Sequence, residues 1–394
     1  IWSASNTTNG NGSSINTNMK NSIVGGINAL DRNSDGFMDH LYFADLGGQV
    51  FRADFTNAGS TRYTTTTTAT GTTQTATAQT AFANQRVTRI LSDTPNTTLT
   101  GSMKLRFYER PVVSFYRNPT TQRLFTLINV ISGDRSSPLT KIRAAGTEDR
   151  VYGIIDTDVN KAVTQLFDDG FNSTSTTNTQ NIINLTDSNL TALPLDLATN
   201  RTTTINTAKA AMNNGTSRGW YYPLNRFEGF LNVYNGKGVG KSEVIGNYLY
   251  TTVYSPDMNY DTSASCSAKI IGGSERQLYC LPYGICSNAT SLSGTGGFVR
   301  AGKGIQELTL GPRSDSLANQ KVLVGTETLD QRASPRVGYG NDDGKVLASN
   351  GGVGLTSSTA VKTSGNYKGD GSAAEFIFNE RYVLTPSTWY EVAK

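Results

Sequence analysis

The sequence contains few of the side chains on which most catalytic centres depend. Among its 394 residues there is one histidine, His40, and there are three cysteines and three tryptophans. His40 lies beside Asp39, a candidate metal ligand, so it would have to serve two sites at once to join a Ser-His-Asp triad, a Cys-His pair or a zinc site. We therefore expect none of these sites and interpret His40 as a structural residue at the rim of the metal site.

Charged residues are also scarce, at 17%, and hydrophobic residues make up only 36%. The net charge is +4, but the 35 Lys and Arg residues are scattered along the chain. Nucleic-acid surfaces gather such residues into a run or onto one helix face, so we expect no nucleic-acid partner. No apolar run approaches the roughly 18 residues that a membrane helix needs, and the first residues lack a signal-peptide pattern. We expect no transmembrane segment and a mature or excised fragment.

The three cysteines, Cys266, Cys280 and Cys286, fall within one short region rich in Gly and Ser. Such spacing suits a disulfide-stapled loop in an oxidising compartment better than a metal or redox site. All three are disulfide candidates. Their pairing stays open, with one cysteine left over.

Glycine and uncharged polar residues fill much of the chain, a composition typical of all-β, loop-rich proteins. Short segments rich in β-branched and aromatic residues recur without long helices between them, which favours a sandwich, a barrel or a propeller. Because a closed β-architecture can take this many residues, we expect a single domain over 1–394. The expected strands include 86–91, 111–116, 123–130, 150–156, 219–224, 242–245 and 248–254, with a closing pair at 374–378 and 388–392.

Two segments interrupt this pattern. The Thr-rich segment 56–85 has little to bury, so we expect a solvated loop or a polar edge strand there. Residues 157–215 are expected to form an insertion with short helices. The clearest helix covers 207–212 and is stopped by Asn213, Asn214 and Gly215.

The segment 31–39 has the register of a calcium loop. Oxygen-bearing side chains stand at alternate positions, Gly36 permits a sharp turn at the sixth place, and the seventh place supplies a backbone carbonyl. The twelfth place holds Tyr42 where an EF-hand has a bidentate Glu, and the flanks favour strands, so we expect a loop between two strands instead of two helices. The bland alternative is an ordinary polar turn. The candidate Ca²⁺ ligands are Asp31, Asn33, Asp35, the Phe37 carbonyl and Asp39.

Other tempting patterns are weaker. The segment 235–242 ends in Gly-Lys-Ser, but a phosphate-binding loop needs glycine where Asn235 stands and a helix where a hairpin is expected. Asp156 and Asp158 could form a carboxylate pair for glycoside chemistry, yet nothing in the sequence places a substrate between them. The acidic segments 168–170 and 341–344 are expected to be ordinary turns.

A family resemblance rests on blocks that occur in a fixed order. They are D-R-N-S-D-G-F-M-D-H-L-Y, A-D-L-G-G-Q-V-F-R-A-D, V-Y-G-I-I-D, G-W-Y-Y-P-L and S-E-V-I-G-N-Y-L-Y-T-T-V-Y-S-P-D. In this order they resemble the C-terminal domain of the PilC/PilY-type adhesins of bacterial type IV pili, over residues 20–290 of the chain. Asn33 stands where many relatives have Asp, which lowers the charge of the ligand set.

The resemblance implies a modified β-propeller of about seven blades, related in shape to quinoprotein propellers, with the calcium loop on a hairpin. It implies a place on the surface of a Gram-negative bacterium, at the pilus tip or outer membrane. There the protein would promote pilus assembly, oppose retraction and contribute to host attachment, twitching motility and virulence. The expected partners are pilus components, such as minor pilins or the protein's own N-terminal domain, and host cell-surface or matrix molecules.

We therefore expect a non-enzymatic domain that binds calcium. A quinone-dependent dehydrogenase is the alternative from another class, because such enzymes are also propellers that use calcium to hold their cofactor. That class would favour adjacent cysteines and a Trp motif in each blade, whereas this sequence has spaced cysteines and three tryptophans. A glycan- or matrix-binding adhesin with a purely structural calcium ion is the third hypothesis.

Overall fold

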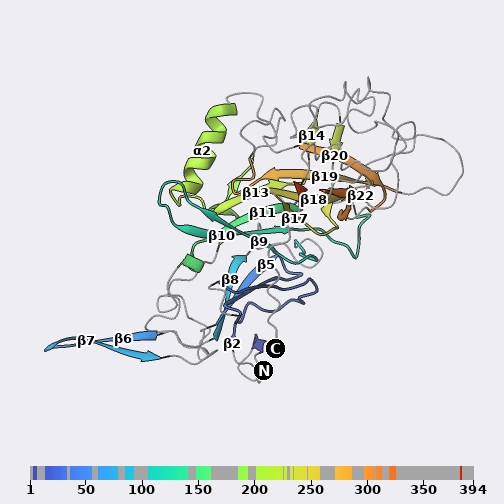
Figure 1. Cartoon of the computed structure of the whole chain (residues 1–394). Helices are drawn as coiled ribbons and strands as arrows, with labels where there is room; N and C mark the ends of the chain where they lie inside the picture. The colour runs from blue at the N-terminus through green and yellow to red at the C-terminus, as the bar shows by residue number, and fades with distance from the viewer. Residues whose placement is uncertain are drawn as a thin grey trace, which may run out of the picture.

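The computed structural model describes residues 3–6, 14–32, 36–55, 61–78, 85–92, 105–140, 148–160, 185–193, 201–224, 226–228, 231–233, 235–245, 247–257, 271–285, 297–305, 308–312, 319–324 and 382–383. Within these ranges the chain is mainly β-strand, with one α-helix and two short 3-10 helices (Figure 1). None of the helices in this part is long and apolar enough to cross a lipid bilayer. The expected all-β class is confirmed, while barrel or propeller closure and the number of blades stay predictions.

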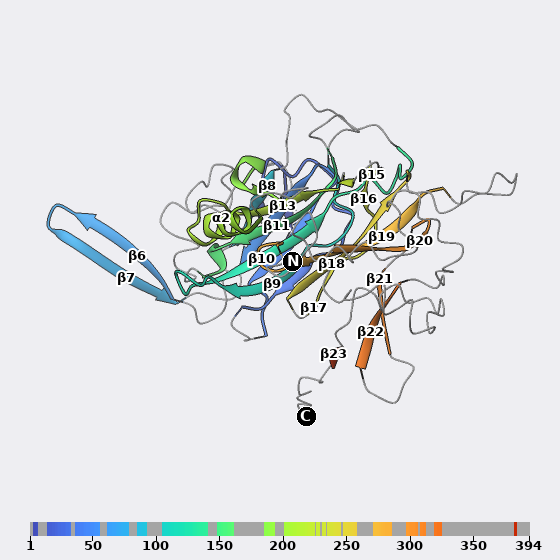
Figure 2. The same ribbon diagram turned by 90° about the horizontal axis from the view of Figure 1, so that it is seen from above.

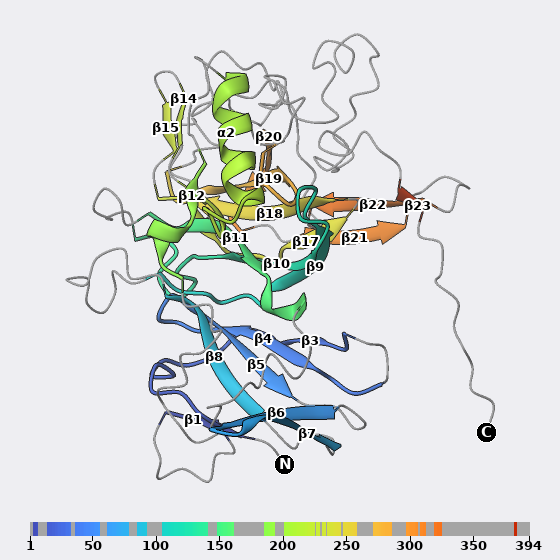
Figure 3. The ribbon, with the colours of Figure 1, turned by 90° about the vertical axis from the view of Figure 1, so that its left-hand side faces the viewer.

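Three mainly antiparallel sheets form the body of the molecule, and Figure 3 shows them as successive layers. The first sheet has the order β3-β4-β5-β8 and consists of β3 (Asn28–Leu30), β4 (His40–Ala44), β5 (Gln49–Phe55) and β8 (Gln85–Ser92). The β4 and β5 strands form the hairpin expected after the metal loop. The strand expected at 86–91 is β8.

The second sheet lies in the middle and has the order β12-β13-β11-β10-β9. Its antiparallel strands are β9 (Val112–Arg117), β10 (Leu124–Ile131), β11 (Arg150–Asp156) and β13 (Gly219–Pro223), and the short β12 (Thr191–Ala192) pairs parallel with β13. Each of the four long strands coincides with an expected one to within two residues at its ends.

The third sheet has the order β16-β18-β19-β20, with β17 also paired to β18. Its strands are β16 (Lys237–Gly238), β17 (Glu243–Ile245), β18 (Tyr248–Ser255), β19 (Gly273–Cys280) and β20 (Gly297–Lys303). Asn247, in the turn between β17 and β18, has φ of 67°. Asn is one of the residues that tolerate this left-handed conformation, which is why Gly-Asn predicts a tight hairpin here.

The middle sheet is buried on both faces, and alternation along its strands divides the hydrophobic core. Ile128 and Ile154 pack into a core shared with the first sheet, whereas Leu127 and Ile155 pack into a core shared with the third sheet. The second core also receives Trp220 of β13 and one face of α2 (Arg201–Asn213). Burial on both faces explains the nearly continuous apolar runs of β10 and β11.

The helix α2 lies beside the middle sheet (Figures 1 and 3). It begins six residues before the helix expected at 207–212 and ends at Asn213, the first of the expected stop residues. Two 3-10 helices, η2 (Asp158–Asn160) and η3 (Asp187–Asn189), belong to the same stretch of sequence. Helices are thus present among the described residues of 157–215, and that this stretch is an insertion stays a prediction.

The Thr-rich segment differs from the expected loop or single edge strand. It forms a hairpin of β6 (Thr61–Thr68) and β7 (Gly71–Ala78), which pair only with each other within the described residues and project from the body (Figure 2). Threonine favours strands, and two facing polar strands satisfy each other's backbone groups without burying an apolar face.

The remaining strands form small sheets: β1 (Ala4–Ser5) with β2 (Ser14–Ile15), β14 (Arg226–Glu228) with β15 (Leu231–Val233), and β21 (Leu308–Pro312) with β22 (Asn319–Val324) and β23 (Tyr382–Val383). The closing strands expected at 374–378 and 388–392 lie outside the described residues, as do the acidic turns at 168–170 and 341–344.

Candidate calcium loop and buried charge network

The candidate metal loop joins the antiparallel strands β3 and β4, as the sequence predicts. Leu30 and His40 are Cα partners at the base of this hairpin, and the Asp39 N–H donates to the Leu30 carbonyl at 2.8 Å. The loop is therefore held at its two ends by the first sheet, where an EF-hand would have helices.

Both carboxylates described in the loop accept backbone hydrogen bonds from within it. Asp31 Oδ2 accepts from the Gly36 N–H at 2.8 Å, and Asp39 Oδ2 accepts from the Arg32 N–H at 2.6 Å. Gly36 has φ of 87°, a left-handed conformation that side chains rarely adopt, although a Cβ there would meet no atom within 4 Å. The coil of the chain thus fits the tight turn that a calcium loop needs at its sixth position.

The exposure of the predicted ligands differs along the loop. Asp39 is fully buried, Asp31 is half-buried and Phe37 is 45% exposed. The Phe37 ring has no ligand atom, so within this residue only the backbone carbonyl is a predicted ligand. Asn33 and Asp35 lie outside the described residues. Among the described residues, no three His, Cys, Asp or Glu side chains are placed to hold a metal ion, so Ca²⁺ at this loop stays a prediction.

His40 is buried, and its contacts are structural, as expected. Its side chain is 1% exposed, and its Nδ1 lies 2.7 Å from Asp54 Oδ1. His40 and Asp54 are Cα partners across β4 and β5, so their side chains project from the same face of the sheet. A carboxylate can only accept, which assigns the donated proton to Nδ1.

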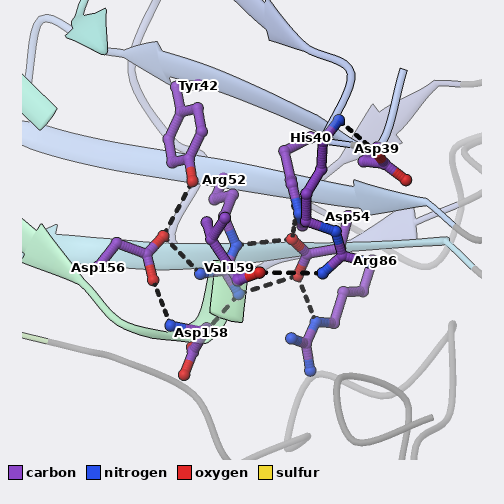
Figure 4. A network of polar contacts seen from close by, with 10 residues as sticks. Asp39, His40, Tyr42, Arg52, Asp54, Arg86, Asp156, Asp158 and Val159 are labelled. Atoms are coloured by element: carbon purple, nitrogen blue, oxygen red, sulfur yellow. Dashed lines mark hydrogen bonds and ion pairs between the residues drawn. The ribbon is translucent and has the colours of Figure 1, made fainter. Parts of the chain in front are cut away.

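Arg52 of β5 is the centre of a buried charge network that the sequence patterns did not predict (Figure 4). Its guanidinium is 1% exposed and bonds to three carboxylates. Nε lies 2.6 Å from Asp54 Oδ1, Nη1 lies 2.7 Å from Asp156 Oδ2, and Nη2 lies 3.3 Å from Asp158 Oδ2. Arg86 of β8 adds a second cation, with Nε 2.7 Å from Asp54 Oδ2. The network bridges the first and middle sheets.

Asp156 and Asp158 are brought together, but not as a pair that flanks a substrate. Both are buried, Asp156 Oδ1 accepts from the Asp158 N–H at 2.9 Å, and Asp156 Oδ2 accepts from the Tyr42 hydroxyl at 3.0 Å. Both also pair with Arg52. The carboxylates are thus engaged in joining two sheets and are closed to a glycoside.

Burial and charge act against each other in this network. Burial would raise the pKa of Asp54, but Arg52 and Arg86, together with His40, hold that pKa well below its usual range. Burial would lower the pKa of Arg52, and the neighbouring Asp156 and Asp54 carboxylates raise it well above its usual value instead. Burial and the Asp156 carboxylate raise the pKa of Tyr42 well above its usual value, so Tyr42 stays a hydroxyl donor.

The candidate metal loop is connected to this network through Arg32. The backbone N–H of Arg32 donates to Asp39, and its side-chain Nη1 donates to the carbonyl of Val159 at 3.1 Å. Val159 follows Asp158 in η2, and its carbonyl lies beside the network in Figure 4. One residue of the loop thus contacts both a predicted metal ligand and η2, which follows β11.

The cysteine prediction is supported in part. Cys280, at the end of β19, is disulfide-bonded. Cys266 and Cys286 lie outside the described residues, so the pairing remains open.

The Gly-Lys-Ser segment has no helix after it, as expected. Lys237 lies in β16, and its buried Nζ donates to the Thr140 carbonyl. Lys237, which precedes the Gly-Lys-Ser sequence, is thus a structural donor within the sheet. The segment then leads directly into the β17–β18 hairpin.

No protein-family model matches the sequence, and a search of curated proteins finds no match. Among solved structures, the crystal structure of the Pseudomonas aeruginosa PilY1 C-terminal domain is similar. The sequence identity is 16% and the TM-score is 0.42, over 76% of this chain and 58% of that chain. The chain thus spans less than two thirds of the length of that protein chain. The neighbour is of the PilY type that the sequence blocks resemble.

Proposed function

We propose that this chain is a calcium-binding, non-enzymatic domain of a type IV pilus protein, which promotes pilus assembly and opposes retraction at the surface of a Gram-negative bacterium. The observation that carries the proposal is the closed loop, in which Asp31 and Asp39 accept backbone hydrogen bonds around a left-handed Gly36. The pilus context is supported by the order of the sequence blocks, which resembles that of the PilC/PilY-type adhesins.

Calcium would act on this loop by charge compensation. The Asp31, Asp35 and Asp39 carboxylates repel one another when they are brought together, and a divalent cation removes that repulsion. Asp39 is fully buried and its carbonyl accepts from the Phe55 N–H of β5 at 2.9 Å. Fixing Asp39 therefore fixes one end of the β4–β5 hairpin.

The effect of the ion would reach the middle sheet through Arg32. Its N–H bonds to the Asp39 carboxylate and its guanidinium bonds to the Val159 carbonyl, so a change in the loop changes the support of η2. We propose that occupancy stabilises the contact between the first two sheets and thereby the surface that pilus components recognise.

Calorimetric titration of the chain with CaCl₂ tests the metal site. Asp31→Asn keeps an oxygen that can accept the Gly36 hydrogen bond but removes one negative charge from the ligand set. We expect a wild-type dissociation constant between about 10⁻⁷ and 10⁻³ M and binding weakened about tenfold or more in the variant. Asp257→Asn is the matched control, because Asp257 is an exposed turn residue outside the loop. Equal affinity in wild type and Asp31→Asn would remove the site.

The pilus role needs a separate test in a bacterium that produces the protein. Surface pili would be counted in strains with wild type, Asp31→Asn or Asp257→Asn, each with and without the retraction motor. We expect few pili in Asp31→Asn cells with the motor and a normal number without it, because the proposed function opposes retraction. Equal piliation in all strains would reject the role and leave the calcium measurement unaffected.

A further inference from the structure

A cavity of about 540 Å³ lies at the junction of the middle sheet and α2, away from the candidate metal loop. Three walls form it. One is the β9–β10 turn with Arg123, the second is the end of α2 with the segment that leads to Arg218, and the third is Tyr283 after β19. Its volume is within the range of about 300–1,000 Å³ that is usual for small-molecule sites.

Hydrogen bonds through Asn213 hold the three walls together. The Asn213 carbonyl accepts from Asn118 Nδ2 of the β9–β10 turn at 2.8 Å, and its side-chain Oδ1 accepts from the Tyr283 hydroxyl at 2.7 Å. The N–H of Arg218 donates to the Asn189 carbonyl at 2.8 Å, and its carbonyl accepts from the Ile155 N–H at 2.9 Å. The cavity is thus formed before any ligand binds, which reduces the entropic cost of binding.

Two arginines line this cavity, and no Asp or Glu is among the described residues that line it. The Arg218 side chain makes one long hydrogen bond, from Nη2 to Thr157 Oγ1 at 3.4 Å, and neither Arg123 nor Arg218 has an ion-pair partner among the described residues. The acidic neighbours on the chain are turned away, since Asp156 is buried against Arg52 on the other face of β11.

The C-terminus of α2 at the cavity does not cancel this charge. A helix end carries about half a negative charge, against two full positive charges from the arginines. The Ala210, Ala211 and Asn213 carbonyls already accept hydrogen bonds from Asn214, Ser217 and Asn118, respectively. The cavity therefore favours an anion.

The other lining groups distinguish the kind of anion. Asn214 offers side-chain N–H donors and Thr157 a hydroxyl, which hydroxyl groups of a ligand need, and Leu124 and Tyr283 offer apolar surface. A planar guanidinium matches a carboxylate with two parallel hydrogen bonds. A sugar that carries a carboxylate presents all three features in one molecule: an anion, several hydroxyls and an apolar ring face.

We propose that this cavity binds a carboxylate-bearing sugar, of the sialic acid or uronic acid class, with Arg218 and Arg123 on the carboxylate. The site would give the domain a direct contact with acidic glycans. It is separate from the calcium loop and does not rest on the function proposed above.

The test is titration of the whole chain, by calorimetry or ligand-observed NMR, with N-acetylneuraminic acid and with glucuronic acid. The methyl esters of both sugars, inorganic phosphate and a short neutral peptide with a free C-terminus serve as comparison ligands. We expect at least one of the two acids to bind. Its methyl ester should bind at least about tenfold more weakly, because a charged hydrogen-bonded pair is lost.

Variants place the binding in the cavity. Arg218→Gln and Arg123→Gln should each weaken binding about tenfold or more, and Arg218→Lys should weaken it less because the charge is kept without the planar fork. Arg117→Gln is the matched control, because Arg117 is an exposed arginine on β9 that does not line the cavity, and it should bind as wild type does. Circular dichroism confirms that each variant is folded.

Four results would overturn the proposal: no binding of either acid, equal binding of acid and ester, binding of phosphate or the peptide as tight as that of the sugar acid, or full binding by folded Arg218→Gln. The third result would assign the cavity to another anion class.

Discussion

Arg52→Met removes the positive charge that three buried carboxylates share and keeps a long, unbranched side chain in its place. In the folded protein Asp54 would retain Arg86 and His40, but Asp156 and Asp158 would lose the ion pairs at 2.7 and 3.3 Å. These carboxylates are almost fully buried, so water cannot replace Arg52. The variant therefore leaves negative charges close together in a region of low dielectric.

The expected cost follows from this burial. Removing one partner of a buried ion pair typically destabilises a protein by about 3–5 kcal/mol, whereas an exposed pair contributes about 0–1 kcal/mol. Arg135→Met is the matched control, because Arg135 pairs with Glu109 at 2.6 Å on the surface, with 38% of its side chain exposed. We expect Arg52→Met to lower the free energy of unfolding at pH 7 by about 3–5 kcal/mol and Arg135→Met by less than about 1 kcal/mol.

The pH dependence gives a second readout. The pKa of Asp54 is held well below its usual value in the folded state, mainly by Arg52 and Arg86 against the effect of burial. A depressed pKa contributes stability above the unfolded pKa of about 3.9, and that stability is lost as the pH falls through the folded pKa. Without Arg52 the pKa of Asp54 is lowered less, so the difference between wild type and Arg52→Met should shrink as the pH falls below about 4.

Urea unfolding measures both the loss of unfolding free energy at pH 7 and its change with pH. Unfolding is monitored by tryptophan fluorescence, because Trp220 is fully buried in the core beneath α2. The reasoning fails if Arg52→Met and Arg135→Met are equally mild at pH 7. It also fails if the difference between wild type and Arg52→Met is the same at pH 7 and at about pH 2, below the unfolded pKa of Asp54.

Three further variants examine the loop and its link to the network. Arg32→Ala should leave the heat of calcium binding nearly unchanged but abolish the calcium-induced protection of residues 150–160 in hydrogen exchange, because the bond to Val159 is lost; full protection would reject the link. Gly36→Ala should destabilise the loop by about 1 kcal/mol through its φ of 87° and weaken calcium binding, whereas wild-type affinity would show that the loop does not use this conformation. Tyr42→Phe should cost about 1–3 kcal/mol in urea unfolding, because Asp156 loses a buried donor, and no change would mean that water replaces the hydroxyl.

The sequence was most informative where one residue type decides the local structure. Strands β10 and β11 were predictable because both of their faces are apolar, and the β17–β18 hairpin because Asn247 tolerates the left-handed turn. The left-handed turn at Gly36 in the candidate metal loop also agrees with the spacing of the sequence. Short-range periodicity and turn chemistry are therefore sufficient for these elements.

The buried network could not be assembled from the sequence, because it depends on which strands become neighbours. Arg52 and Asp54 are two residues apart, which places them on one face of β5, and charged residues at such alternate positions in an apolar strand are the available signal. Asp156, more than 100 positions later, joins them only because the middle sheet packs on the first. The burial of His40 was missed for the same reason.

The polar composition of this network also suggests its role in the fold. A buried ionic cluster is often less favourable than apolar residues of the same volume, so stability alone does not explain Arg52 here. A register shift of one residue in β5 would turn Arg52 and Asp54 to the other face of the first sheet, into the apolar cluster that contains Phe51 and Phe55. Asp156 would then lose its partner Arg52. The network thus makes other pairing registers of the β4–β5 hairpin less stable than the observed one. Because the candidate calcium loop joins β3 to that hairpin and contacts η2, we infer that the same register is what the ion would stabilise.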